Sequence, residues 1–414
     1  MSMGVLTKAW LVLACLLISM SGPVRAQTVT ADDTARVLAG MAPSAGSPLA
    51  AVTEDPAWRR HAAFLDNAFN LLEQRQLSRI RSWADLNLAA PRPAMFYFFS
   101  GPDFLYADAF HAKATTYVMA ALEPTGPVPD LTRLPPGSIG PALSYVERSL
   151  QSILSFSFFI TKNMKSDLRD GEIEGTLPIL YVFLARTGKT IRSASLIWLD
   201  ESGGLHAGNE PATRNATRGA RIKFAGADGV EKTLDYFSTD LSDSGVKASG
   251  FLKFCEPLAP ANSLLKSASY LLHERSFSQV RSWLLKNSAT IIQDDSGIPL
   301  ASYDPRAWRF FPFGRYLGPI DKFPDKYQPG YAALFEHAPP LDFGIGYRWR
   351  TRESNLLLSV RTPSSDTTIS AEATGPADTS YQPPRARRAP RPPEFIPMYP
   401  PPPRRDDFMF WPRW

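Results

Sequence analysis

Residues 96–107 read Phe-Tyr-Phe-Phe-Ser-Gly-Pro-Asp-Phe-Leu-Tyr-Ala, and this stretch carries the chain from a strand into a helix. The aromatic run Met95–Phe99 predicts a short buried strand that stops at a Gly-Pro turn. A helix is expected to follow over residues 103–112. Polar residues of the turn are therefore held at a corner between two apolar elements.

Ser100, Gly101 and Asp103 occupy this corner, where free amides and the helix dipole often favour a bound ligand. Two features weaken an anion site, because Pro102 has no N–H and Asp103 adds a negative charge. The alternative to a ligand site is a purely structural one. Ser100 or Gly101 would then be the helix N-cap, and the negative charge of Asp103 would be favourable at the positive end of the helix dipole. Asp103 is kept as a catalytic candidate, and Ser100 and Gly101 are kept as ligand-binding candidates.

Outward from this corner, helical and strand patterns alternate irregularly. The apolar spacing predicts a helix over 58–86 that breaks near Gln76. The other expected elements are strands at 115–122, 176–183, 191–199, 221–224 and 232–237 and helices at 143–154 and from 264 onward, with the apolar pattern continuing through 284. Hairpins are present and a regular βαβ ladder is not visible. We therefore expect an α+β fold with a mixed or antiparallel sheet and packed amphipathic helices.

The first 26 residues read as a secretory signal peptide. Lys8 precedes an apolar run, and Ala26 closes a small-residue cleavage pattern. An uncleaved anchor fits less well because the run is shorter than the ~20 residues of a spanning helix. A lipoprotein signal fits less well because Cys15 lies inside the run rather than at its end. The mature chain is expected to begin near Gln27 and to work in the periplasm or as a secreted protein.

The remaining chain divides by composition into three parts. Residues 27–55 are expected to be a flexible lead-in, and residues 56–360 a globular body with a possible lobe boundary near 245–260. The sequence of residues 78–83 is similar to that of residues 278–283. Either an internal duplication of the chain or chance would explain this similarity. Residues 361–414, rich in Pro and Arg, are expected to form a disordered tail. Its aromatic end suits either folding back on the body or binding a protein or envelope partner.

Charge and cysteine content limit the kinds of partner and the kind of fold that we expect. The net charge of +5 includes two basic residues of the leader, so the mature chain is nearly balanced and nucleic acid is not implied. No later segment has the length of a membrane helix. Cys255, the single mature cysteine, is interpreted as a small buried hydrophobe rather than a nucleophile. We expect a fold without disulfides, and no motif requires a cofactor or a metal.

Two further sets of residues could carry chemistry. Asp294 and Asp295 follow an Ile-Ile strand and could supply a general acid or base if burial raised a pKa, although an Asp-Ser-Gly turn also explains them. Adjacent side chains on an extended backbone point to opposite faces. His111 ends the helix that Asp103 begins, where a cation would suit the dipole. The G-x-S-x-G signature of a serine hydrolase does not occur.

Several motifs together resemble a family of uncharacterised exported bacterial proteins. They are residues 96–107, Ala-Leu-Glu-Pro ending at 124, Gln-Asp-Asp-Ser-Gly-Ile-Pro at 293–299 and Phe-Gly-Ile-Gly-Tyr-Arg-Trp at 343–349. The resemblance covers about residues 58–360. The resemblance implies an exported location and a globular body whose length is the same across the family. It implies no activity.

Two classes of function stay open. The first is a non-catalytic binding or envelope-associated protein, which predicts an apolar concave surface without clustered acids. The second is an extracytoplasmic hydrolase that uses Asp103, His111, Asp294 or Asp295. The second class predicts that Ser100, Asp103 and the aspartate pair converge.

Overall fold

A computed structural model describes residues 28–88, 91–159, 173–208 and 215–362. These residues belong to one compact unit that ends at Ser364. The expected leader, the Pro/Arg-rich tail and the partner-binding role of its aromatic end fall outside the described residues.

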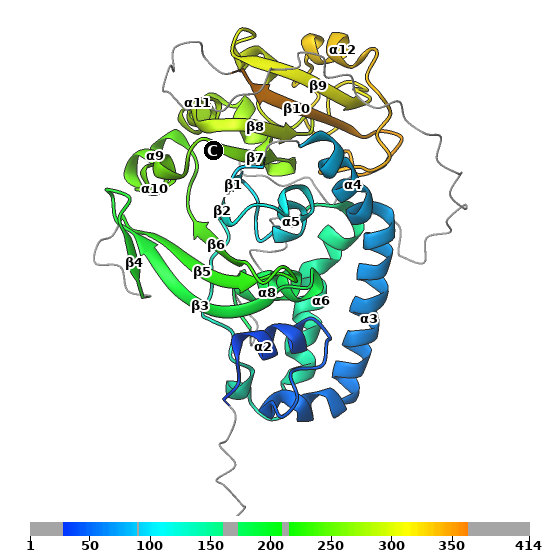
Figure 1. Ribbon diagram of the computed structural model, residues 1–414, viewed down its shortest axis with the longest axis vertical. Helices are drawn as coiled ribbons and strands as arrows, with labels where there is room; N and C mark the ends of the chain where they lie inside the picture. Colours follow the sequence, from blue (N-terminus) through cyan, green and yellow to red (C-terminus); the bar gives the residue numbers. More distant parts are fainter. Residues whose placement is uncertain (1–27, 89–90, 160–172, 209–214, 363–414) are drawn as a thin grey trace, which may run out of the picture. The chain divides into compact units, whose positions relative to one another are not determined.

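One mixed sheet of ten strands organises the described residues, so the expected α+β class is confirmed (Figure 1). Its centre is parallel and its two flanks are antiparallel. The central strands, in spatial order, are β6 (Glu231–Ser238), β2 (Thr116–Ala121), β1 (Ala94–Phe98), β7 (Ala261–Leu265) and β8 (Ser288–Gln293). The flanks are β4 (Leu205–Ala207), β3 (Thr190–Leu199) and β5 (Thr217–Ala225) beside β6, and β10 (Asn355–Arg361) and β9 (Trp308–Gly314) beside β8.

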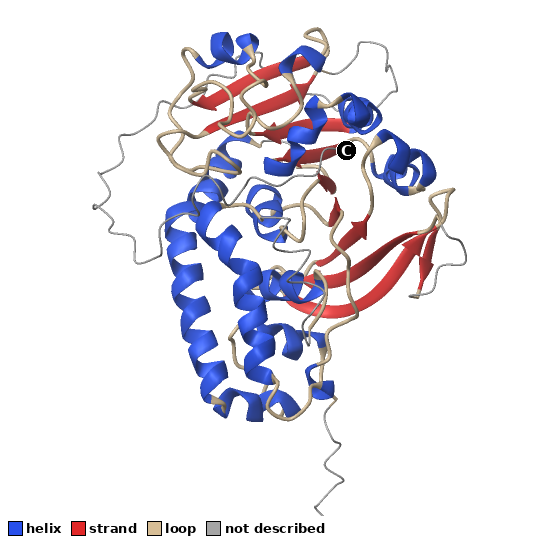
Figure 2. Ribbon diagram, turned by 180° about the vertical axis from the view of Figure 1, so that it is seen from behind, coloured by secondary structure: helices blue, strands red, loops and turns tan. Residues whose placement is uncertain are grey.

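Helices cover both faces of the central parallel strands, as is usual for parallel sheets. Alternate residues of β1 enter two different cores: Met95 and Tyr97 face one, and Phe96 and Phe98 face the other. The first core is packed by α2 (Ala31–Leu38), α3 (Pro56–Leu72), α4 (Ser78–Asn87), α5 (Phe104–His111), α6 (Ile139–Phe156) and α8 (Leu177–Arg186). The second is packed by α9 (Asp243–Ala248), α10 (Phe251–Cys255) and α11 (Ser278–Asn287). Figure 2 shows these helices from behind, and α12 (Pro329–Phe335) lies beside β9.

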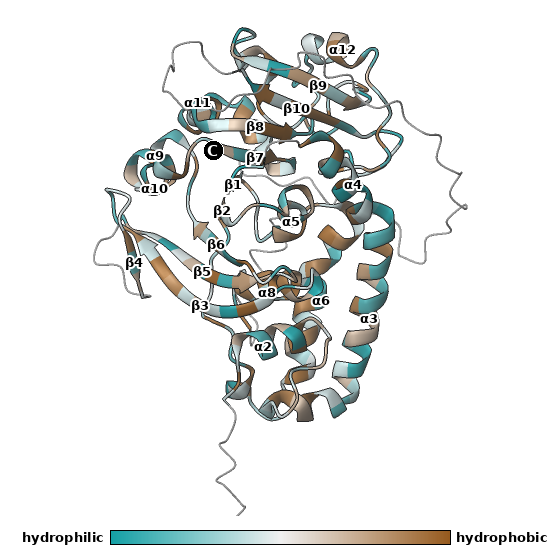
Figure 3. Cartoon of the chain, in the orientation of Figure 1, coloured by the Kyte–Doolittle hydropathy of each residue, from teal (hydrophilic) through white to brown (hydrophobic). Residues whose placement is uncertain are grey.

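The long amphipathic helix does not break near Gln76 as expected, but continues there through one π-helical segment. Along α3, polar and apolar residues alternate at helical spacing, and Figure 3 shows this as bands of teal and brown. Between α3 and α4 the backbone forms a π-turn over Glu73–Leu77, which contains the buried Gln76. Such π-turns insert an extra residue and often serve a site.

Two expected elements are wrong in type. Residues 176–183 form part of α8 rather than a strand, because a run that is buried on every side carries no periodicity to separate helix from strand. Residues 261–265 form β7 rather than the start of a helix, and helical structure follows as a 3₁₀ segment at Ser267–His273 and as α11.

Two expectations about organisation also change. The lead-in contains α2, which begins with a capping box at Thr30 and buries Val37 and Leu38. The sheet continues across the possible boundary at 245–260, since β7 pairs with β1. Cys255 is buried and free, as expected, and burial raises its pKa.

Candidate active site

The parallel strands define one place where a ligand site is expected. From β1 the chain moves outward to β2 and then to β6, and it later returns to the other side of β1 to form β7 and β8. Ligands of open parallel sheets bind beyond the carboxyl ends of the strands where the strand order reverses, which here is between β1 and β7. Asp103 follows β1, Lys266 follows β7 and Asp294 follows β8.

Numbered by appearance, the parallel strands run 3-2-1-4-5, the order of doubly wound dinucleotide-binding sheets. The loop after β1, however, lacks the glycine-rich phosphate fingerprint. Pro102 removes one backbone donor from it, and Asp103 occupies the helix N-cap with its carboxylate. The topology therefore points to a site, and the loop chemistry points away from a phosphate.

Asp103 and Lys266 form a fully buried ion pair at this reversal. Lys266 Nζ lies 2.8 Å from Asp103 Oδ2, which also accepts a hydrogen bond of 2.7 Å from the hydroxyl of Tyr97. Asp103 Oδ1 accepts from the backbone N–H of Tyr106 at 3.2 Å and so caps α5. Burial raises the pKa of Asp103 and lowers the pKa of Lys266, because their attraction only partly offsets the loss of water.

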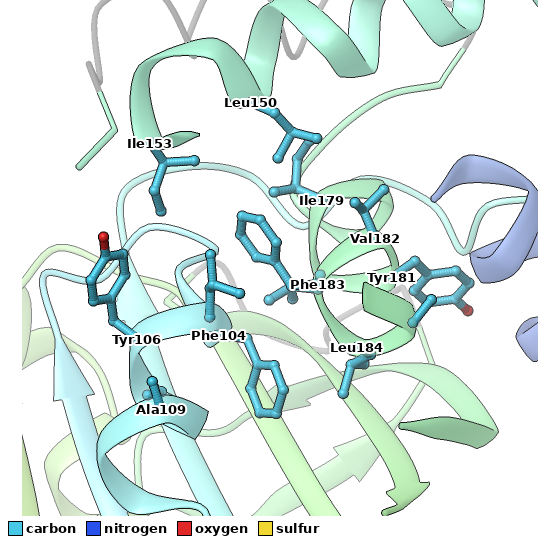
Figure 4. Packing of buried hydrophobic residues seen from close by; sticks show 14 of the residues in the cluster. Phe104, Tyr106, Ala109, Leu150, Ile153, Ile179, Tyr181, Val182, Phe183 and Leu184 are labelled. Carbon is cyan, nitrogen blue, oxygen red and sulfur yellow. The ribbon is translucent and has the colours of Figure 1, made fainter. Parts of the chain in front are cut away.

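A network of polar groups holds the lysine in place. Its ammonium lies 3.8 Å from the centre of the Tyr106 ring and donates to the carbonyl of Ser157. The Tyr106 hydroxyl donates to Gln76 Oε1, and Gln76 Nε2 donates to Gly344 O at 2.8 Å. The π-turn thus brings Gln76 to the site. Figure 4 shows Tyr106 on α5 near Ile153 of α6 and Phe183 of α8, in the core that supports it.

Asp294 has one carboxylate oxygen that is used in hydrogen bonds and one that is not. Its Oδ1 accepts from the backbone N–H of Ser296 at 3.0 Å and from the Ser296 hydroxyl. Its Oδ2 is buried and has no hydrogen-bond partner among the described residues. Burial first, and the adjacent Asp295 second, raise the pKa of Asp294 to about 7, while Lys266 opposes this rise. The carboxyl group is therefore suited to exchanging a proton near neutral pH.

Asp295 lies in the turn after β8 and pairs with a different partner. Arg348 donates to its Oδ2 through Nε at 3.1 Å and through a terminal nitrogen at 3.0 Å. The backbone N–H of Asp295 donates to Asn355 Oδ1 at 2.9 Å. Burial raises the pKa of Asp295 despite the neighbouring Arg348. This second ion pair fixes segment 343–349 against the turn after β8.

The backbone is strained on three sides of this site. Among the described residues other than glycine, Phe99, Ser157 and Ser267 adopt positive φ values, of 62°, 70° and 61°. Phe99 and Ser267 lie just beyond β1 and β7, and the carbonyl of Ser157 accepts a hydrogen bond from the Lys266 ammonium. Left-handed conformations cost energy in residues with a side chain and gather where geometry serves function.

The structure brings together some of the candidate residues expected from the sequence and not others. Asp103 and Asp294 both interact with Lys266, which is one part of the convergence that the hydrolase hypothesis predicts, whereas the hydroxyl of Ser100 bonds to its own neighbour Gly101. Asp103, rather than Ser100 or Gly101, is the N-cap of α5, since Ser100 Oγ donates to the Gly101 carbonyl at 2.6 Å. The expected cation at His111 is wrong, because burial lowers its pKa to about 4 and leaves it neutral.

Several residues of the site are not among the candidates expected from the sequence. They are Tyr97, Tyr106, Gln76, Ser157, Lys266, Ser267 and Arg348. Tyr97, Tyr106 and Arg348 lie within sequence motifs, and this was the signal that could have pointed to them. The sequence motifs at residues 96–107, 293–299 and 343–349 all contribute to this site.

No known protein family, curated protein or solved structure matches the chain. Within the described ranges, no three His, Cys, Asp or Glu residues are grouped so that they could hold a metal ion. Across the same ranges, no helix has the length and apolar character to cross a membrane.

Proposed function

We propose that this chain is an extracytoplasmic hydrolase whose centre comprises Asp294, Lys266 and Asp103. One observation carries the proposal: a buried carboxylate oxygen of Asp294, unpartnered among the described residues, lies at the carboxyl end of a central parallel strand. Buried polar atoms normally find a partner, so such an oxygen marks a place for a water molecule or a substrate group.

The chemistry of the centre supports proton transfer. A general base works best when its pKa lies near the operating pH, and the pKa of Asp294 is about 7. Lys266 places a buried positive charge beside it, which favours the ionised form and can stabilise negative charge on a reacting group. Asp103 and Tyr97 keep that lysine in position.

The alternative of a non-catalytic binding protein has less support. That hypothesis expects an apolar concave surface without clustered acids, whereas Asp103, Asp294 and Asp295 gather in one buried region. Perturbed carboxyl groups beside a buried cation are typical of catalytic sites.

The test is a hydrolysis assay on the chain beginning at Gln27, with chromogenic esters, amides, phosphoesters and glycosides. Asp294→Asn should reduce turnover of the accepted substrate at least ~100-fold. Asp321→Asn, at an exposed aspartate, is the matched control and should keep full activity. Failure of the folded protein to turn over any substrate class, or full activity of Asp294→Asn, would refute the proposal.

Export is proposed on the leader alone. Sequencing the N-terminus of protein recovered outside the cytoplasm should give Gln27 as the first residue. Recovery of the protein only from the cytoplasm, with Met1 retained, would contradict it.

A further inference from the structure

Ser267 has the geometry of a nucleophile. It comes two residues after β7, at the reversal of strand order, and starts a 3₁₀ helix. Its φ of 61° is left-handed, and its buried hydroxyl has no hydrogen-bond partner among the described residues. Hydrolytic serines are presented on the same kind of sharp, strained turn from strand to helix. Local structure thus gives this hydroxyl no role of its own.

The unpartnered oxygen of Asp294 faces the same point as this hydroxyl. A Cβ added to Gly346 would lie 2.9 Å from Ser267 Oγ and 2.1 Å from Asp294 Oδ2. Both oxygens therefore pack against Gly346 at the position that a side chain would occupy, which places them on the same side of this glycine. Gly346 itself is held by its N–H, which donates to Ser157 Oγ at 3.2 Å.

We propose that Ser267 is the nucleophile of this centre and that Asp294 Oδ2 is its base, an inference that rests on the proposed hydrolase function. Ser267 Oγ attacks the acyl carbon of an ester while its proton passes to Asp294. The bond from the acyl carbon to the leaving oxygen breaks, and the alcohol departs with that proton. Water then attacks the acyl-serine, gives a proton to Asp294, and releases the acid as the proton returns to Ser267.

The surroundings favour an apolar acyl group. Tyr347, next to Gly346, is partly exposed and packs with Phe158 at 5.0 Å and with Phe323 at 5.7 Å between ring centres. Tyr270, one turn after Ser267, stacks on Phe323 at 4.1 Å. These rings form a partly exposed aromatic surface beside the serine, so the substrate class is an ester with an aliphatic or aromatic acyl chain.

The chain supplies variants that separate this role from a structural one. Ser267→Gly removes the hydroxyl and suits the left-handed backbone, so it should fold. Ser269→Ala is the matched control, because Ser269 is also buried but its hydroxyl already contacts Ser296 at 3.2 Å. A third variant, Asp294→Asn, keeps the serine and removes the base.

The experiment treats the chain from Gln27 with an alkyl fluorophosphonate, in which a serine oxygen displaces fluoride from phosphorus. Peptide mass mapping of the wild-type protein should place the adduct on Ser267. Ser267→Gly should show none, Ser269→Ala should label at the wild-type rate, and Asp294→Asn should label at least tenfold more slowly.

An adduct on another residue, or no adduct on a protein that hydrolyses esters, would overturn the inference. Ester hydrolysis that survives in Ser267→Gly but is lost in Asp294→Asn would do the same while leaving the proposed function intact, since Asp294 would then activate water directly. Loss of the proposed function itself would show as absence of both labelling and hydrolysis.

Discussion

Replacement of Asp294 by asparagine should stabilise the protein above neutral pH while removing its activity. Folding raises the pKa of this carboxyl from 3.8 to about 7, so the native state binds its proton more tightly than the unfolded chain. Since each tenfold change in proton affinity is worth ~1.4 kcal/mol, the ionised carboxylate costs the native state roughly 4 kcal/mol above pH 7.

The direction follows from protonation. Below pH 3.8 the group is protonated in both states and costs nothing, and the cost grows as pH rises from about 4 to about 7. Asparagine keeps an oxygen for Ser296 and never ionises. The difference in unfolding free energy, variant minus wild type, should therefore be near zero at pH 4 and should approach ~4 kcal/mol at pH 8. Stability gained at the expense of activity is typical of functional residues.

Urea unfolding followed by tryptophan fluorescence at several pH values measures this difference, and the chain contains nine tryptophans. Asp321→Asn is the control and should show little dependence on pH. A difference that is the same at pH 4 and pH 8, or an Asp294→Asn variant that loses stability at pH 8, would refute the reasoning.

Three other changes test how the site is held. Lys266→Met leaves Asp103 buried and unpaired and should cost about 3–5 kcal/mol in urea unfolding, with partial recovery when Asp103→Asn is added; no recovery would disprove the pairing. Gly346→Ala should cost clearly more than Gly229→Ala, which has a positive φ but open space and should cost ~1–2 kcal/mol, and equal losses would contradict the close contact at Gly346. Gln76→Leu removes the hydrogen bonds of Gln76 to the Tyr106 hydroxyl and the Gly344 carbonyl and should cost about 1–3 kcal/mol, so an unchanged urea midpoint would argue against this network.

Elements with strong local signals could be predicted from the sequence. The spacing of apolar residues indicates α3 and α4 and an irregularity near Gln76, which is a π-helical segment rather than a break, and the aromatic run indicates β1. The Asp-Ser-Gly turn expected after the Ile-Ile strand is present, since Asp294 accepts hydrogen bonds from Ser296 and Gly297. These predictions succeeded because each depends on residues close together in the chain.

The rest depends on contacts between distant segments. The meeting of Asp103 with Lys266 follows from the pairing of β1 with β7, which no local pattern encodes. Lys266 was overlooked because the apolar residues around it match helical spacing and because lysines are seldom fully buried. The strand expected in place of α8 failed for a related reason, since complete burial removes the period that separates helix from strand.

The most direct measurement of the central claim is the titration of the Asp294 carboxyl group. Difference infrared spectra between the wild-type protein and Asp294→Asn isolate its protonated carbonyl band as pH is varied. The account predicts a midpoint near pH 7, as expected for a buried carboxyl group able to exchange protons in the active site. A midpoint near 4, the value of an ordinary solvated aspartate, would contradict it.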